Sequence, residues 1–144
     1  MRKIAVAMLA AALAGCSLST EDPSSTILTG DFTLATIDNA APPVVESENA
    51  TSRTMLVNAR LSLYTDLHFM QVLNYETTLK SDGSKTTQQT VRNGTFVVQK
   101  DFIVFQIPNF RGDSPPQGWG ATFGNNVIEF TGPIDSRVSV YRRD

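Results

Sequence analysis

The stretch Met55-Leu-Val-Asn-Ala-Arg-Leu-Ser-Leu-Tyr64 alternates apolar and polar side chains almost throughout. A period of two is typical of a β-strand with one buried face, because successive side chains point to opposite sides of a sheet. Thr65-Asp66 follows and predicts a turn. The odd-numbered residues are predicted to face the core: Met55, Val57, Ala59, Leu61 and Leu63.

The same period continues on both sides of this strand, and turn residues interrupt it at short intervals. Asp82-Gly83, for example, supplies the positive φ that tight hairpin turns require. No window carries a helical stripe over three turns. The other predicted strands are Gly30 to Ile37, Leu67 to Lys80, Lys85 to Arg92, Thr95 to Gln99, Phe102 to Ile107, Gly118 to Gly124, Val127 to Thr131 and Arg137 to Arg142.

Two connections are long. Asp38 to Ser52 contains Pro42-Pro43, so it is predicted to be a connection, with room for a short helical turn, and not an interior strand. Asn109 to Gln117 is rich in Gly and Pro and predicts a loop. Asn93-Gly94 is predicted to be a turn or the entry of the next strand.

Strands joined mostly by short hairpins form an antiparallel meander. Closing the first strand onto the last removes both exposed edges, which favours an up-and-down β-barrel of about eight strands. The alternative is a two-sheet β-sandwich, whose crossings need longer connections than most of those here.

Composition limits the function classes. The chain has 144 residues, of which 41% are apolar and 18% charged, as in ordinary globular domains. Without Arg2 and Lys3, which precede an apolar leader, 10 basic residues face 14 acidic ones. This balance argues against nucleic-acid binding. One Cys and one His exclude a disulfide scaffold and a Cys/His zinc cage.

The N-terminus has the pattern of a secretory signal, since two basic residues precede the uncharged run Ile4 to Ala14. This run is too short to span a bilayer, which takes about 18 to 20 apolar residues. One interpretation is an ordinary signal cut after Ala12-x-Ala14, with Cys16 a bystander. The other rests on the residues at the end of the run, Leu13-Ala14-Gly15-Cys16.

Leu13-Ala14-Gly15-Cys16 resembles the lipobox of bacterial lipoproteins. The resemblance implies that residues 1–15 are removed, that Cys16 is acylated and that the protein is anchored to the membrane. Ser17, in place of an Asp, implies the outer membrane if the source is Gram-negative. Residues 16–28 then form the lipidated Cys and a flexible tether rich in Ser, Thr and acidic residues, and residues 29–144 form the domain.

Five pieces of the domain match one family in their order and spacing: Gly30 to Leu34, Ile37 to Val45, Asp82-Gly83-Ser84, Gly94-Thr95-Phe96 and Val140 to Arg143. On these pieces the domain resembles the lipocalin-like domains found in many bacterial lipoproteins of unknown function. This likeness implies a barrel and a location, not a reaction. Two features depart from the family pattern: Asn39-Ala40 replaces a frequent Asn-Gly, and the loop after Pro108 is longer and richer in proline.

His68 is the only imidazole of the chain, and Asp66 precedes it by two residues. The pair is either a general base or metal ligand with an orienting carboxylate, or a loop-end His beside a turn Asp, and the second interpretation is preferred. No catalytic residue, metal or cofactor is therefore assigned.

In Phe102 to Phe105, both faces of the expected strand are apolar. One face fills the barrel. The other is either covered by the Asp38 to Ser52 connection or binds a partner, in which case Ile103 and Phe105 are the candidate residues.

An eight-stranded barrel is either packed with side chains or holds one small molecule. Seventeen large apolar residues compete for the interior, so we expect at most a shallow pocket at one mouth. Trp119, Phe123 and Tyr64 are candidate ligand contacts. The first functional hypothesis is a non-enzymatic, membrane-anchored protein that binds a small apolar ligand or an envelope partner. The alternative is a structural or stress-related envelope protein with a solidly packed barrel.

Overall fold

The computed structural model describes residues 28–108, 117–131 and 137–144. These residues form strands, turns and connections, with no helix among them. The strands are β1 (Gly30–Ile37), β2 (Val44–Glu48), β3 (Ser52–Leu63), β4 (His68–Leu79), β5 (Lys85–Gln99), β6 (Phe102–Ile107), β7 (Gln117–Gly124), β8 (Val127–Thr131) and β9 (Val138–Arg143).

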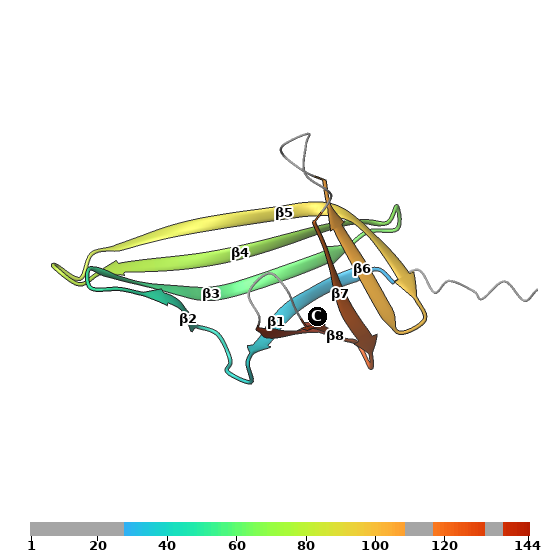
Figure 1. The fold of residues 1–144 in the computed structure, drawn as a ribbon, viewed down its shortest axis with the longest axis horizontal. Helices are drawn as coiled ribbons and strands as arrows, with labels where there is room; N and C mark the ends of the chain where they lie inside the picture. Colours follow the sequence, from blue (N-terminus) through green and yellow to red (C-terminus); the bar gives the residue numbers. More distant parts are fainter. Residues whose placement is uncertain (1–27, 109–116, 132–136) are drawn as a thin grey trace, which may run out of the picture.

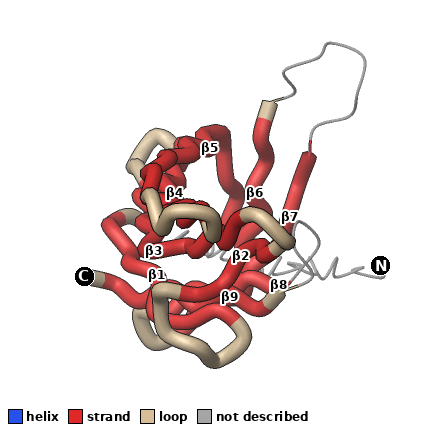
Figure 2. Tube along the Cα trace, turned by 90° about the vertical axis from the view of Figure 1, so that its left-hand side faces the viewer, coloured by secondary structure: helices blue, strands red, loops and turns tan. Residues whose placement is uncertain are grey.

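Eight strands close into an antiparallel barrel. From β3 to β9 each strand pairs with the next in the chain, and β1 pairs with both β9 and β3, which joins the first strand to the last. β2 is an additional strand on the outer half of β3. Seen along the long axis, the strands form a ring (Figure 2). The predicted up-and-down barrel is confirmed.

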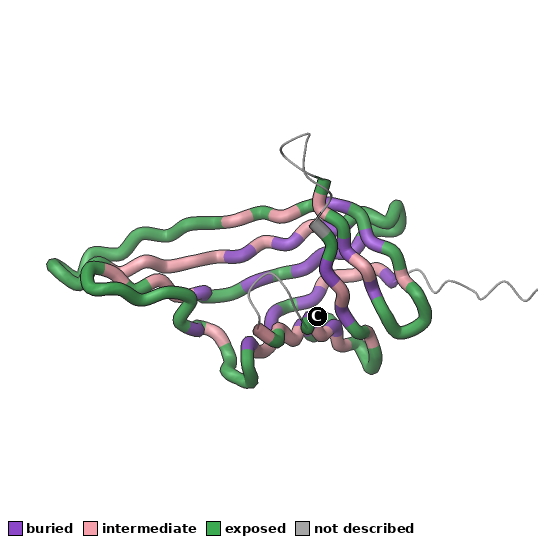
Figure 3. The backbone as a smooth tube through the Cα atoms, in the orientation of Figure 1, coloured by how far each residue is buried: buried purple, intermediate pink, exposed green. Residues whose placement is uncertain are grey.

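The three longest strands, β3, β4 and β5, extend beyond the closed ring (Figure 1). Together with β2 they form a sheet, which we name the arm. It comprises β2 and residues 52–58, 74–79 and 85–93. Most of the arm is exposed or half-buried, whereas buried residues concentrate in the barrel (Figure 3). The molecule therefore has a packed region and an open one.

Phe105 lies at the centre of the barrel core and is fully buried. Its ring contacts Phe69 edge-on at 5.0 Å between centroids and stacks on Trp119 at 5.9 Å. Phe130 lies 5.1 Å away. Aromatic contacts of this kind bury large areas and fix side-chain orientation, so they stabilise the closed barrel more than any polar contact on the arm.

A bulge reverses the predicted face of the first half of β3. The register with β4 runs from Leu56 opposite Tyr75 to Asn58 opposite Asn74, which leaves Val57 as an extra residue. Leu56 is consequently buried, and Val57 is 38% exposed. The prediction that Val57 faces the core is wrong, whereas Leu61 and Leu63, beyond the bulge, face inward as expected.

Two predicted connections contain strand. β2 lies within the Asp38 to Ser52 segment, immediately after the two prolines, where only one of its edges pairs, with β3. Asn93-Gly94 is neither a turn nor a strand entry, because β5 runs through it without interruption. At Gly94 a Cβ would lie 2.0 Å from the carbonyl oxygen of Gln106, so only glycine allows this approach of β5 to β6.

The expectation that Ile103 and Phe105 face outward is also wrong, since both have no exposed surface. Phe105 pairs with Phe96 and Trp119, and residues opposite each other share a face of the sheet. The outer face instead carries Phe102, whose ring lies over Gly120. The Asp38 to Ser52 segment does not cover it, because its strand pairs with β3.

Candidate functional site

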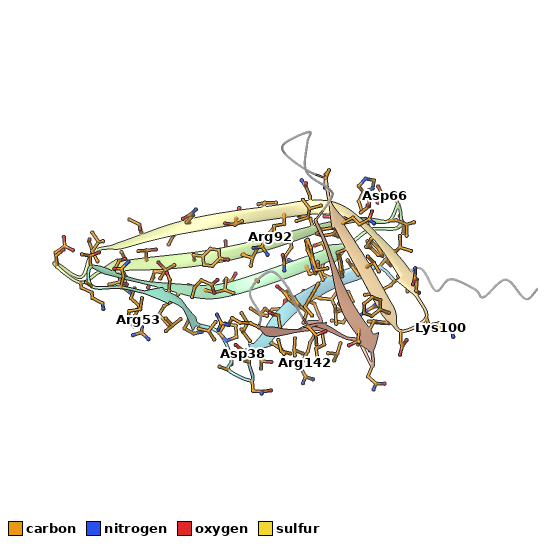
Figure 4. All side chains as sticks on the ribbon, in the orientation of Figure 1. Asp38, Arg53, Asp66, Arg92, Lys100 and Arg142 are labelled. Carbon is orange, nitrogen blue, oxygen red and sulfur yellow. The ribbon has the colours of Figure 1, made fainter. Side chains whose placement is uncertain are left out.

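A small cavity lies where the barrel opens onto the arm. Its volume is about 50 Å³, close to the space of one or two water molecules. The small volume agrees with the expectation of at most a shallow pocket. Figure 4 labels Arg92 on the long strands and Asp38 in the turn after β1, where Asp38 contacts the lining residue Arg137. The lining includes apolar residues of the barrel and polar residues of both regions: Leu56, Leu73, Trp119, Phe130, Gln71, Arg92, Tyr141, Glu46 and Arg137.

Gln71 is the central polar residue of the mouth. It is 6% exposed, and its Nε2 donates to the Oη of Tyr141 at 2.8 Å. β4 supplies Gln71 and β9 supplies Tyr141, so the bond crosses the inside of the barrel. Burying the amide without a hydrogen-bond partner would cost on the order of 2 to 7 kcal/mol of folding free energy. The bond to Tyr141 avoids this cost and joins opposite walls of the barrel.

Arg92 extends the same polar chain toward the arm. Its Nη1 lies 3.5 Å from the Oε1 of Gln71, at the long limit of a hydrogen bond. The described residues place no carboxylate within ion-pair distance of this half-buried guanidinium. The mouth therefore presents a positive charge that is available to a negatively charged or carbonyl-rich group.

The second cation of the mouth, Arg137, is fully compensated. Its Nε lies 2.9 Å from Asp38 Oδ2, and its Nη1 lies 3.2 Å from Glu46 Oε2. The backbone N–H of Val138 also donates to Asp38, at 2.9 Å. That N–H and, after it, the Arg137 guanidinium lower the pKa of Asp38 below its ordinary value. These contacts hold the turn after β1 and the β2 strand against β9.

Asp66 and His68 are close together, as their spacing suggested. The Nδ1 of His68 lies 3.2 Å from Asp66 Oδ2, and Asp66 Oδ1 accepts the backbone N–H of His68 at 3.2 Å. Both side chains are more than half exposed; Asp66 lies in the turn between β3 and β4, and His68 is the first residue of β4. Residues 28–108, 117–131 and 137–144 contain no cluster of three acidic, His or Cys side chains that would hold a metal ion. The two side chains therefore form an exposed pair, and the preferred interpretation of a turn Asp beside a loop-end His stays a prediction.

The three candidate ligand contacts are not brought together. Trp119 is 7% exposed and lines the mouth cavity. Phe123 is partly buried, packs against the core and lines neither the mouth cavity nor the groove beside Tyr64. Tyr64 is 44% exposed and lines a different, open groove of about 670 Å³ on the outside of β4, β5 and β6.

Gln71 and Arg92 are not among the site residues predicted from the sequence, although the sequence pattern around Gln71 indicates its role. Gln71 lies between Phe69 and Leu73, at the same parity as these two core residues of β4. A lone amide on the apolar face of a strand indicates a buried hydrogen bond. Arg92 had no such signal, because the polar strand that contains it shows no apolar face.

Cys16, the expected site of acylation, lies outside the described residues. In the described ranges, no helix has the length and apolarity that crossing a bilayer would need. Comparison with protein-family models, with curated proteins and with solved structures finds no significant match to this chain.

Proposed function

We propose that this chain is a lipoprotein of the bacterial cell envelope, anchored through acylated Cys16, that acts by binding and not by catalysis. The lipobox-like Leu13-Ala14-Gly15-Cys16 at the end of an apolar leader supports the anchor. Several acyl chains hold a protein on a membrane far more firmly than one. The barrel is then a domain of the lipocalin-like lipoprotein class, presented at the membrane surface.

The volume of the mouth cavity, about 50 Å³, bears on whether the barrel binds a small apolar ligand or an envelope partner. Pockets for small ligands usually measure about 300 to 1,000 Å³. A cavity this small favours a solidly packed barrel over one that encloses an apolar molecule. The barrel is therefore a scaffold, and an envelope partner contacts the mouth around Arg92 and the concave face of the arm.

The concave face of the arm, by which we mean the face that continues the inside of the barrel, suits such a partner because, apart from Leu79, its exposed side chains are polar. Tyr75 packs against the core, so the residues that face the same way can be assigned from the register. Thr54 and Thr77 lie on this face and their hydroxyls hydrogen-bond at 2.9 Å. Gln88 lies opposite Tyr75 and is exposed. Transient interfaces are more polar than obligate ones, so this face suits a transient partner.

The anchor is tested in the source bacterium by mass spectrometry of the membrane fraction. We expect the mature chain to begin at Cys16 and to carry acyl chains. Cys16→Ser should release the protein from the membrane without changing its fold. A soluble, unacylated mature wild-type form would refute the anchor.

The binding mode is tested separately, with the fluorescence of Trp119, the single Trp of the chain. Because its side chain lines the mouth cavity, an apolar ligand that enters the barrel must change its emission. We expect no saturable change with long-chain fatty acids. A saturable shift would support the ligand hypothesis and contradict the packed-scaffold proposal.

Partner contact is tested by placing a photo-crosslinking residue in cells at Gln88, on the concave face, or at neighbouring Thr87, on the convex face. The proposal expects the same discrete heterologous product from Gln88 and from a second concave position, Thr86, and none from Thr87. Arg92→Glu should reduce that product. Equal labelling from both faces would contradict a concave binding surface.

A further inference from the structure

One edge of β5 is unpaired over most of its length. β4 pairs with one side of β5 from Lys85 to Thr95, whereas β6 pairs with the other side only from Thr95 to Gln99. Among the described residues, no strand pairs with that side between Lys85 and Asn93. Figure 1 shows this edge running along the arm. The backbone N–H and C=O groups on this side of β5 are therefore available to pair with another strand.

Two hydrogen bonds fix which of these groups point outward. The N–H of Leu79 donates to the carbonyl of Ser84, and the N–H of Phe96 donates to the carbonyl of Leu67. Bonded and non-bonded pairs alternate along an antiparallel ladder, so the even-numbered residues of β5 bond to β4. The odd-numbered residues direct their N–H and C=O groups to the free side: Lys85, Thr87, Gln89, Val91 and Asn93.

This edge lacks the features that usually prevent strands from pairing with other chains. Such features are prolines, bulges and charges along the edge. Residues 85–93 contain no proline, and the register between β4 and β5 has no bulge. Charges occur only near the two ends, at Lys85 and Arg92, while residues 86–91 are uncharged.

We propose that this edge of β5 pairs antiparallel with β5 of a second copy of this chain, about a two-fold axis at Gln89. In this register Lys85 faces Asn93 of the second copy, and Arg92 faces its Thr86, so no like charges meet. Two arms then form one continuous sheet. The interface is isologous and closes on itself as a dimer.

The convex face of the arm supports the choice of Gln89. Its Nε2 donates to Asn74 Oδ1 at 2.9 Å, and Asn74 Nδ2 donates to Asn58 Oδ1 at 2.6 Å. This row of amides ends at the free edge. With Gln89 facing Gln89 of the second copy, the row continues across the two-fold axis as one ladder of hydrogen-bonded amides.

The other unpaired edge of the sheet, on β2, does not suit self-pairing. β2 is short and carries Glu46 and Glu48, and a bulge interrupts its register with β3 at Glu46. An antiparallel pair of β2 strands would bring carboxylates together. The two edges therefore differ in a way that selects β5.

The pairing is tested by cysteine cross-linking of the full chain in native membranes, and the wild-type chain, whose single Cys is Cys16, gives the background. The Cα atoms of a hydrogen-bonded pair of opposite residues in an antiparallel ladder are about 5.5 Å apart. A disulfide spans this distance. Gln89→Cys alone should give a cross-linked dimer on mild oxidation. Thr87→Cys alone should not, whereas Thr87→Cys combined with Val91→Cys should.

A backbone variant supplies the control. Gln89→Pro removes an outward N–H and leaves the β4 ladder intact, whereas Gln89→Ala keeps that N–H. In the Thr87→Cys/Val91→Cys chain, we expect the proline to lower the dimer yield about tenfold and alanine to change it little. Circular dichroism verifies folding. Equal cross-linking at Thr87 and Gln89, no dimer from Gln89→Cys, or a ladder of higher oligomers would overturn the proposal.

Discussion

The closed barrel and the arm share three strands, β3, β4 and β5, yet these strands are buried to different extents in the two regions. In the barrel, the inward face of β4 carries Phe69 and Leu73, both buried. Beyond Tyr75 the same face carries Thr77 and the exposed Leu79. The difference is closure: a strand surrounded by seven others buries its apolar face, whereas a strand in an open sheet leaves it to solvent. Stability should therefore be concentrated in the barrel and partner recognition in the arm.

The largest loss of stability is expected from Phe105→Ala. Its ring contacts four aromatic side chains, and its removal leaves a cavity that the closed barrel cannot fill. The expected destabilisation is about 3 to 5 kcal/mol, measured by urea denaturation. Thr86→Ala on the arm is the control and should change the free energy of unfolding by less than about 0.5 kcal/mol. Similar losses in both variants would contradict the division into two regions.

Gly94→Ala should have the next largest effect, because Gly94 lies where β5 passes from the arm into the barrel. A Cβ there would lie 2.0 Å from the Gln106 carbonyl oxygen and 2.9 Å from Phe69 Cε1. The strands must separate, at a cost of about 2 to 3 kcal/mol.

Gly124→Ala is the matched control for this variant. Gly124 is also a strand glycine, and nothing lies within 4 Å of a Cβ added there. Thermal denaturation of the two variants should differ clearly, and equal midpoints would show that the close approach of β5 to β6 is not required.

These positions also show what sequence can predict. Most strand locations and the closure of β1 on β9 followed from the period of two and from turn residues such as Asp82-Gly83, whereas β2 and the continuity of β5 did not. The pattern was less successful in predicting which face of the sheet each side chain occupies. Val57 faces outward because one extra residue in β3 shifts the parity, and such a bulge depends on pairing with β4, which no local pattern encodes.

The apolar strand β6 illustrates a second limit. With apolar residues on both faces, its parity is undetermined until its neighbours are known. Pairing with Phe96 and Trp119 turns Phe105 inward. The polar contact at the mouth could not be predicted either, because it also depends on strand pairing. Gln71 and Tyr141 lie 70 residues apart and meet only across the closed barrel.

The Gln71–Tyr141 bond gives the third prediction, at the boundary between the two regions. Tyr141→Phe removes the acceptor of the Gln71 Nε2 and should cost about 1 to 3 kcal/mol, because the amide is buried. Gln71→Leu removes the other partner. Denaturant midpoints of the two single variants and the double variant form a thermodynamic cycle, in which the double variant should lose less than the sum. Strict additivity would mean that the bond does not couple the walls.

The smallest effects are expected from two exposed carboxylates, Asp38 at the mouth and Glu48 on the arm. The pKa of Asp38 is lowered first by the backbone N–H of Val138, and that of Glu48 first by Lys80, whose Nζ lies 2.8 Å away. Each folded-state pKa lies below the unfolded value, so each stabilisation is complete above the unfolded pKa. It is lost as pH falls through the folded one. Asp38→Asn and Glu48→Gln should each flatten the acid limb of a plot of stability against pH.

Salt should distinguish these two carboxylates. About 1 M salt screens an exposed ion pair strongly, whereas a backbone N–H donor at 2.9 Å keeps its geometry in salt. The contribution of Glu48 to the acid limb should therefore shrink in salt. That of Asp38 should largely persist, because the largest cause of its lowered pKa is the hydrogen bond from the backbone N–H of Val138, which joins β9 to the end of β1. Equal screening of both contributions, measured by comparing each variant with the wild type at low and high salt, would mean that Asp38 acts through Arg137 alone. Asp38 would then be held by an ion pair, as Glu48 is held by Lys80.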